Sequence, residues 1–159
     1  MSDGGARLEL EGFEAAAPEA RAALTALSKA AADAGLDKQL IELIKIRASQ
    51  INGCAFCVAF HLNLARKLRV SETKLDLVAV WREAGVFSPR EMVALEWTEE
   101  LTNITPHGVS DEVYAAAVVV FEEKELAALT TAVVSINAWN RIAMAYRFTP
   151  SVPQERRSE

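Results

Sequence analysis

Short turn signals divide this sequence into a succession of segments with helical periodicity. In segment 38–51 the apolar residues Ile41, Ile44, Ala48 and Ile51 recur at intervals of three and four residues. This spacing places them on one face of an amphipathic helix. We find no convincing alternation of apolar and polar residues, which is the pattern of a half-buried strand. The sequence therefore predicts an all-α fold.

Helix caps and breaks place the expected helices along the chain. Pro18 fits the first turn of an Ala- and Leu-rich helix, and Asp37, Ser71 and Ser110 are expected N-caps. Ser88-Pro89-Arg90-Glu91 combines a capping box with a proline at the first helical position. We expect a bundle of about six to seven helices, over residues 18–34, 38–51, 54–68, 71–84, 89–101, 110–121 and 123–147, followed by a loose tail at 148–159.

Size and composition describe one globular domain over residues 1–159. Hydrophobic residues make up 51% of the chain and charged residues 25%, with a formal net charge of −5. Nucleic acids and anionic membranes bind proteins mainly through an excess of Lys and Arg, so neither is an expected partner. The uncharged run between Glu125 and Arg141 would span only about 22 Å as a helix, which is too short to cross a bilayer. The N-terminus has no secretory signal, and we expect a cytoplasmic protein.

The residues suited to thiol, metal or imidazole chemistry are few, and most of them lie close together in the sequence. The chain has two cysteines and two histidines, and three of these four form the pattern Cys54-x-x-Cys57-x-x-x-His61. Offsets of three, four and seven residues put their side chains along one helical face. The preceding Asn52-Gly53 break places both cysteines in the first helical turn, where free backbone N–H groups and the helix dipole favour a thiolate.

Glu42 is a candidate base for this group. If helices 38–51 and 54–68 pack antiparallel around the Asn52-Gly53 turn, Glu42 and His61 lie within about 3 Å of each other in height. Whether they face each other depends on helix rotation, which the sequence does not fix. Taken alone, Glu42 would be a solvated charge, exposed or paired with Lys45.

Two other interpretations of the cysteine pair remain open. The cysteines can be two small core residues of a non-enzymatic helical oligomer. The pair and His61 can also supply three of the four ligands of a structural zinc site, with His107 or Glu42 as the fourth. His107 lies in a Thr-Pro-His-Gly turn and is most simply a surface loop residue.

At these residues the sequence resembles the AhpD-like alkylhydroperoxidases of the carboxymuconolactone decarboxylase superfamily. That family's motif is a glutamate, eleven intervening residues and C-x-x-C-x-x-x-H, which Glu42, Cys54, Cys57 and His61 match at every spacing. Segments 43–49 and 51–54 also look like the family's lead-in, and 137–141 resembles a segment of its peroxidase-related members. The resemblance spans roughly residues 20–150.

The resemblance implies a cofactor-free, all-helical thiol peroxidase with a helical hairpin carrying the C-x-x-C motif. By this implication Cys57 attacks the peroxide, Cys54 resolves the product as an intramolecular disulfide, and Glu42 acts as the base through His61 and a bridging water. The partners would be a hydroperoxide and a lipoyl- or thioredoxin-type dithiol reductant. Some peroxidase members carry a second histidine between the cysteines, where this chain has Phe56. The decarboxylase branch lacks the cysteine pair, so the C-x-x-C argues against that activity.

The sequence of the last helix indicates both a polar network and a homo-oligomer. Asn137, Asn140 and Arg141 interrupt an otherwise apolar stretch, and we interpret them as a buried polar network or a subunit contact rather than as catalytic groups. The apolar last helix and the segment 113–121 before it offer more hydrophobic surface than one small domain can cover. We therefore expect a homo-oligomer, from a dimer to a hexamer.

Overall fold

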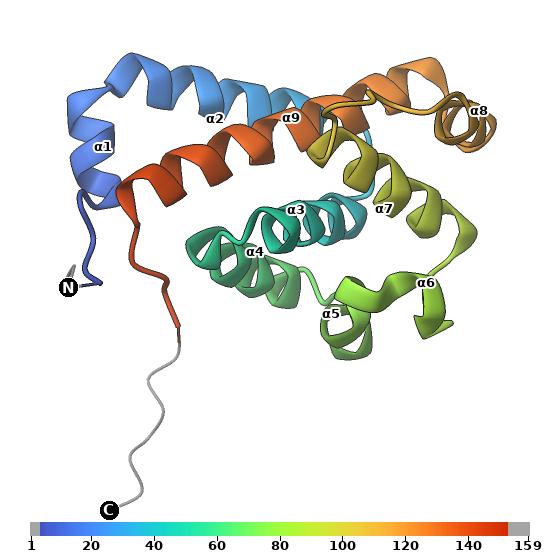
Figure 1. Cartoon of the computed structure of the whole chain (residues 1–159), viewed down its shortest axis with the longest axis horizontal. Coiled ribbons are helices and arrows are strands. Elements are labelled where there is room, and N and C mark those ends of the chain that lie inside the picture. The colour runs from blue at the N-terminus through green and yellow to red at the C-terminus, as the bar shows by residue number, and fades with distance from the viewer. Residues whose placement is uncertain (1–3, 153–159) are drawn as a thin grey trace, which may run out of the picture.

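The computed structural model describes residues 4–152, and every regular element in that range is helical, which confirms the all-α prediction. Figure 1 shows the arrangement of the helices. The elements are α1 (Leu10–Ala16), α2 (Pro18–Asp33), α3 (Lys38–Asn52), α4 (Ala55–Lys67), α5 (Glu72–Leu77), the 3-10 turn η1 (Val78–Val80), α6 (Trp81–Ala84), α7 (Pro89–Thr102), α8 (Asp111–Val120) and α9 (Glu123–Tyr146).

Three of the expected N-caps form as the sequence predicts. The Asp37 carboxylate accepts from the Gln39 N–H at the start of α3. Ser88 and Glu91 make the reciprocal bonds of a capping box at α7, where Pro89 takes the first helical position. The Ser110 hydroxyl accepts from a backbone N–H of α8. These caps satisfy N–H groups that the first helical turn leaves without partners.

Two parts of the chain differ from the expected helices. Helix α1 precedes the predicted start at Pro18, and Ala17 separates it from α2 because the residue before a proline disfavours the α conformation. The helix expected over 71–84 is divided into α5, η1 and α6, and Ser71 makes no side-chain cap bond there. The division falls at Val78 and Val80, whose branched side chains are stiff in a helix.

The segment after α9 is held more firmly than a loose tail. Arg147 adopts a left-handed conformation, and the Phe148 N–H returns to the Ala143 carbonyl. The Phe148 ring is buried, and the backbone and hydroxyl of Thr149 both donate to Glu9. The sequence showed little to bury here because the surface that covers Phe148 comes from the other end of the chain. The rest of the expected tail, 153–159, lies outside the described residues.

Helix α3 lies at the centre of the bundle, where it contacts α4, α7 and α9. In Figure 1, α2 and α9 run side by side along the top, α3 lies beneath them, and α4 returns antiparallel along α3 to make the predicted hairpin. Helix α7 packs on α3 and carries α8 at the far end. No helix among the described residues is long and apolar enough to cross a membrane.

The core divides into a large and a small cluster of buried side chains. The large cluster gathers α3, α7 and the first half of α9 around Leu43, Ile44 and Leu129. The small cluster contains both cysteines, with Phe13 from α1 and Phe148 from the C-terminal segment packed against them. The two chain ends thus build the surroundings of the cysteine pair.

One half-buried carboxylate joins three helices, α3, α6 and α7. Glu99 on α7 accepts hydrogen bonds from Arg47 on α3 and from the indole of Trp81, and it pairs with Arg82 on α6. Burial raises the pKa of the Glu99 carboxyl, but these hydrogen bonds outweigh burial and leave the pKa below its ordinary value. Glu99 therefore stays ionised and fastens the short α6 helix to the core.

Candidate functional site

The turn between α3 and α4 sets the position of the cysteines. Gly53 ends α3 with φ of 75°, a left-handed conformation that favours glycine, and Cys54 is the N-cap of α4. The Cys54 Sγ accepts from the Cys57 N–H at 3.3 Å. Cys54 and Cys57 are joined as a disulfide, with 5.4 Å between their Cα atoms. The pair thus lies at the helix N-terminus, where the sequence places it.

Glu42 and His61 meet across the hairpin. Helix rotation directs the two side chains at each other, and Glu42 Oε2 lies 2.7 Å from His61 Nδ1. Both residues are buried, at 6% and 8% exposure. A carboxylate accepts, so Nδ1–H is the donor to Glu42, and in the neutral imidazole Nε2 is the nitrogen that can accept a proton.

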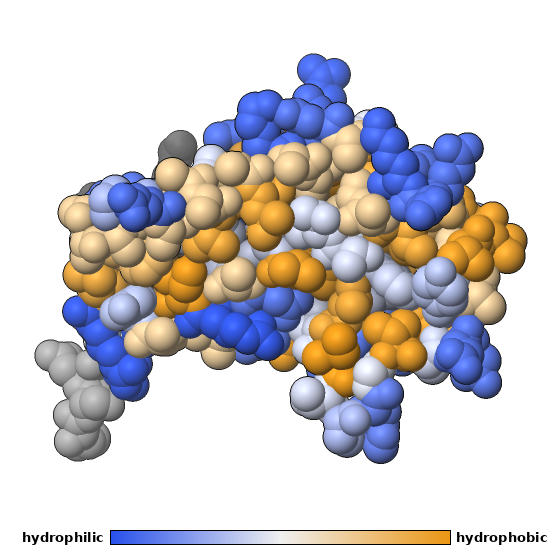
Figure 2. Space-filling model, turned by 90° about the horizontal axis from the view of Figure 1, so that it is seen from above, coloured by the Kyte–Doolittle hydropathy of each residue, from blue (hydrophilic) through white to orange (hydrophobic). Residues whose placement is uncertain are grey.

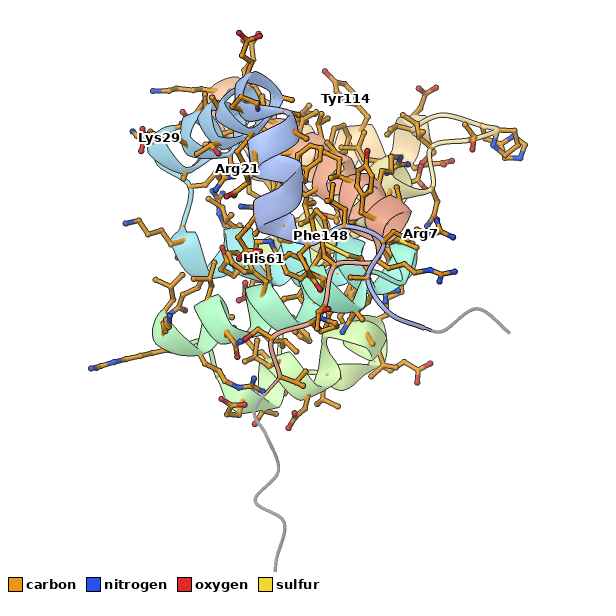
Figure 3. The ribbon with its side chains drawn as sticks, turned by 90° about the vertical axis from the view of Figure 1, so that its left-hand side faces the viewer. Arg7, Arg21, Lys29, His61, Tyr114 and Phe148 are labelled. Atoms are coloured by element: carbon orange, nitrogen blue, oxygen red, sulfur yellow. A yellow bond between two sulfur atoms is a disulfide. The ribbon has the colours of Figure 1, made fainter. Side chains whose placement is uncertain are left out.

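His61 and Cys57 open into one cavity. They lie one helical turn apart on α4, and both line a space of about 240 Å³. Its walls are mainly apolar and aromatic, including Phe56 and Phe60 of α4 and Trp139 of α9. In Figure 3, His61 lies among the side chains around α1, with the labelled Arg21 above it on α2 and Phe148 beside it. The imidazole of His61 therefore shares a mainly apolar space with Cys57.

Lys45 is a cavity residue whose position the sequence analysis missed. It lies one turn after Glu42 on α3, is 9% exposed and lines the cavity with Cys57 and His61. Burial lowers the pKa of its ammonium group, and the charge of Glu42 partly offsets this. None of the ion pairs among residues 4–152 includes Lys45. The i, i+3 spacing from Glu42 is the signal that could have found it.

The predicted polar network on α9 is present and fastens the end of α3. Asn140 is fully buried and donates to Ser49 Oγ at 3.0 Å, while its Oδ1 accepts from Asn52 at 2.8 Å. Asn137 accepts from Asn52 at 2.9 Å, and exposed Arg141 donates to Asn137. The network holds the last turn of α3, directly before Gly53 and the cysteines.

Cys54 borders a second hollow of about 570 Å³ that shares no lining residue with the first. Asn63 and Arg66 of α4 and residues 150–152 of the C-terminal segment also line it. The two sulfurs of the disulfide therefore border different spaces.

The two cysteines proposed as zinc ligands are joined to each other as a disulfide, so neither is a thiolate ligand in this structure. Within residues 4–152, no group of three or more His, Cys, Asp and Glu side chains is arranged to hold a metal ion. His107 is exposed in the loop between α7 and α8, which confirms its interpretation as a surface residue. It is therefore no fourth ligand to the cysteine pair and His61.

Known proteins are similar to this chain in both sequence and fold. A sequence profile of the carboxymuconolactone decarboxylase family matches residues 18–100. The uncharacterised protein YdfG of Bacillus subtilis (strain 168) is 36% identical over 129 residues, which are 81% of this chain and 88% of YdfG.

Two solved structures extend the comparison to three dimensions. A protein of unknown function from Agrobacterium tumefaciens, provisionally named as an antioxidant defence protein AhpD, is 37% identical with a TM-score of 0.88, covering 94% of this chain and 100% of that one. An uncharacterised peroxidase-related protein with an alkylhydroperoxidase AhpD core, from Ralstonia eutropha JMP134, is 23% identical with a TM-score of 0.73, covering 88% and 75%. The second likeness shows the fold alone.

Proposed function

This chain belongs to the carboxymuconolactone decarboxylase family and has its AhpD-like helical fold, and on that premise we propose that it is a thiol-dependent hydroperoxide reductase. One observation carries the proposal: the buried Glu42–His61 hydrogen bond lies one helical turn from Cys57, within reach of the same cavity. The name given to the relative from Agrobacterium agrees with this chemistry.

The reaction begins with a proton transfer. His61 Nε2 accepts the proton of the Cys57 thiol, and Glu42 stabilises the imidazolium that forms. The Cys57 thiolate attacks the terminal oxygen of the hydroperoxide, the O–O bond breaks, and the leaving alkoxide takes the proton back from His61. The products are an alcohol and a sulfenic acid on Cys57.

The cycle closes through Cys54. Its thiol attacks the Cys57 sulfur, water leaves, and the disulfide forms. A dithiol reductant of the lipoyl or thioredoxin type then supplies two electrons and two protons, which restores both thiols. The separate hollow at Cys54 supports an approach by this reductant that leaves the Cys57 cavity free. Disulfides of cytoplasmic proteins are usually catalytic or redox-sensing, and a redox-active pair is in keeping with a protein of the cytoplasm.

The proposal includes a homo-oligomer, from a dimer to a hexamer. Tyr114, Val118 and Val119 on α8 and Val134 on α9 are exposed, with Val119 at 84%. Figure 2 shows several separate hydrophobic areas on the face that it presents, one of them at the α8 end. Tyr114 and Val118 lie one turn apart on the same face of α8, and this exposed apolar face supports a protein–protein contact. Light scattering that gives a monomer at micromolar concentration would exclude the oligomer.

The decisive experiment is mass spectrometry of the reduced protein after one equivalent of hydroperoxide. We expect a Cys54–Cys57 disulfide in the wild type and a sulfenic acid on Cys57 in the Cys54→Ser variant. The Cys57→Ser variant should consume no peroxide. If both thiols of the wild type survive unchanged, the peroxidase proposal is wrong and the cysteines are structural.

A further inference from the structure

Lys45 takes no part in the peroxide cycle, yet the chain buries it in the cavity where the cycle takes place. Burying an ammonium group is costly unless an anion compensates it. The nearest candidate, Glu42, gives its Oε2 to His61 and forms no ion pair with Lys45. Within residues 4–152, Lys45 therefore has no ion-pair partner, and it lines the same cavity as Cys57.

The charged side chains that line this cavity are both cations. No aspartate or glutamate is among the described residues that line it, although the whole chain has a net charge of −5. Lys45 and Arg21 line it as cations, and Arg21 is already paired with Glu14. Three hydroxyl side chains, those of Thr25, Ser28 and Ser135, also line the cavity. The cavity is thus suited to an anion.

The remaining walls and the volume limit the ligand further. Phe56, Phe60 and Trp139 supply aromatic surface, and Leu64 and Ile136 supply aliphatic surface. An enclosed space of about 150 Å³ holds a benzene ring. The 240 Å³ available here therefore accommodates one ring or a short alkyl chain with a polar group at each end.

We propose that the substrate is an organic hydroperoxide that carries a carboxylate, with the carboxylate bound by Lys45, the apolar body against Phe60 and Trp139, and the peroxide group at Cys57. This inference rests on the proposed function and adds a substrate class to it. Lys45 is then the specificity-determining residue, and uncharged hydroperoxides of the same shape are poorer substrates.

A matched pair of ligands tests the anion site without any turnover. The probes are 4-isopropylbenzoate and its methyl ester, titrated into the disulfide form and followed by tryptophan fluorescence. A charge-assisted hydrogen bond corresponds to a preference of about tenfold to a hundredfold, so we expect the acid to bind wild type more tightly than the ester by that factor. Lys45→Met should abolish the preference and Lys45→Arg should keep part of it. Lys124→Met, at an exposed site near the start of α9, should retain it fully.

The reactive pair is cumene hydroperoxide with a para-carboxylate and the methyl ester of that compound. We expect wild type to form its disulfide faster with the acid than with the ester. In Lys45→Met, the two rates should be equal. Equal binding and equal rates for acid and ester in wild type would overturn the inference while the peroxidase function stands. An equal slowing of both reactions in Lys45→Met would also overturn it, because Lys45 would then act on Cys57. If wild type binds the acid more tightly than the ester but forms no disulfide with either hydroperoxide, the anion site is supported and the peroxidase function is refuted.

Discussion

Replacing Glu42 by Gln tests the proton relay with little change in shape. Glutamine has nearly the same size as glutamate, and its amide oxygen can still accept from His61 Nδ1 across the 2.7 Å contact. The change removes the negative charge that stabilises the imidazolium formed when Cys57 loses its proton. It therefore separates the electrostatic role of Glu42 from its packing.

The magnitude follows from the nature of the bond. A hydrogen bond to a charged group contributes about 1.5–3 kcal/mol, and a neutral one about 0.5–1.5 kcal/mol. Both Glu42 and His61 are buried, so water screens the lost charge only weakly. A loss of about 1.4 kcal/mol corresponds to a tenfold decrease in rate and to a shift of about one pH unit.

The assay follows Cys57 in the reduced protein. At pH 7 we expect disulfide formation with hydrogen peroxide to slow about tenfold in Glu42→Gln, and the pH of half-maximal Cys57 alkylation to rise by about one unit. Hydrogen peroxide carries no carboxylate, so this rate does not depend on substrate binding by Lys45. Glu72→Gln removes an exposed carboxylate and should leave rate and profile unchanged.

One neighbour could imitate this result. Loss of Glu42 also removes the charge that partly offsets the burial of Lys45. The comparison is therefore repeated in a Lys45→Met background. There, disulfide formation should still be about tenfold slower with Glu42→Gln than without it. An unchanged rate and an unchanged alkylation profile in folded Glu42→Gln would refute the relay.

Three further predictions concern the scaffold. Asn140→Ala leaves the buried Ser49 hydroxyl without this partner and removes one of two bonds from half-buried Asn52, so we expect urea unfolding to show a loss of about 2 kcal/mol; a loss below 1 kcal/mol would contradict the network's role. Gly53→Ala should cost about 1–2 kcal/mol in the same assay from its positive φ alone, because nothing lies within 4 Å of an added Cβ. The lowered pKa of Glu99 contributes stability that is fully present above about pH 4.5 and lost as pH falls through the folded-state pKa; the stability gap between wild type and Glu99→Gln should shrink between pH 5 and 2, and a constant gap would contradict this.

Interactions between neighbouring residues were readable in the sequence. The caps at Asp37, Ser88 and Ser110 each join groups two or three residues apart, and the structure has all three. The Gly53 break and the hairpin that it permits also follow from local backbone preferences. The family assignment rested on the same kind of information, since the motif is a set of fixed spacings.

Contacts between distant segments were not readable. Helix α1 has only seven residues, too few to be stable alone, and it forms because Phe13 packs on Trp139 and Phe148. Phe148 looked like part of a tail because its partners Phe13 and Phe56 lie 135 and 92 positions earlier in the chain. The covering of the cysteine pair therefore depends on the meeting of the two chain ends.

The sequence by itself determined the N-caps of α3, α7 and α8, the turn at Gly53 and the alignment of Cys54, Cys57 and His61, because each depends on backbone geometry within a few residues. Only the tertiary structure decided that Glu42 faces His61, that Lys45 is buried without a partner, and that the two sulfurs border different spaces. Helix rotation and burial are set by the packing of side chains from remote segments, and no local preference encodes that packing.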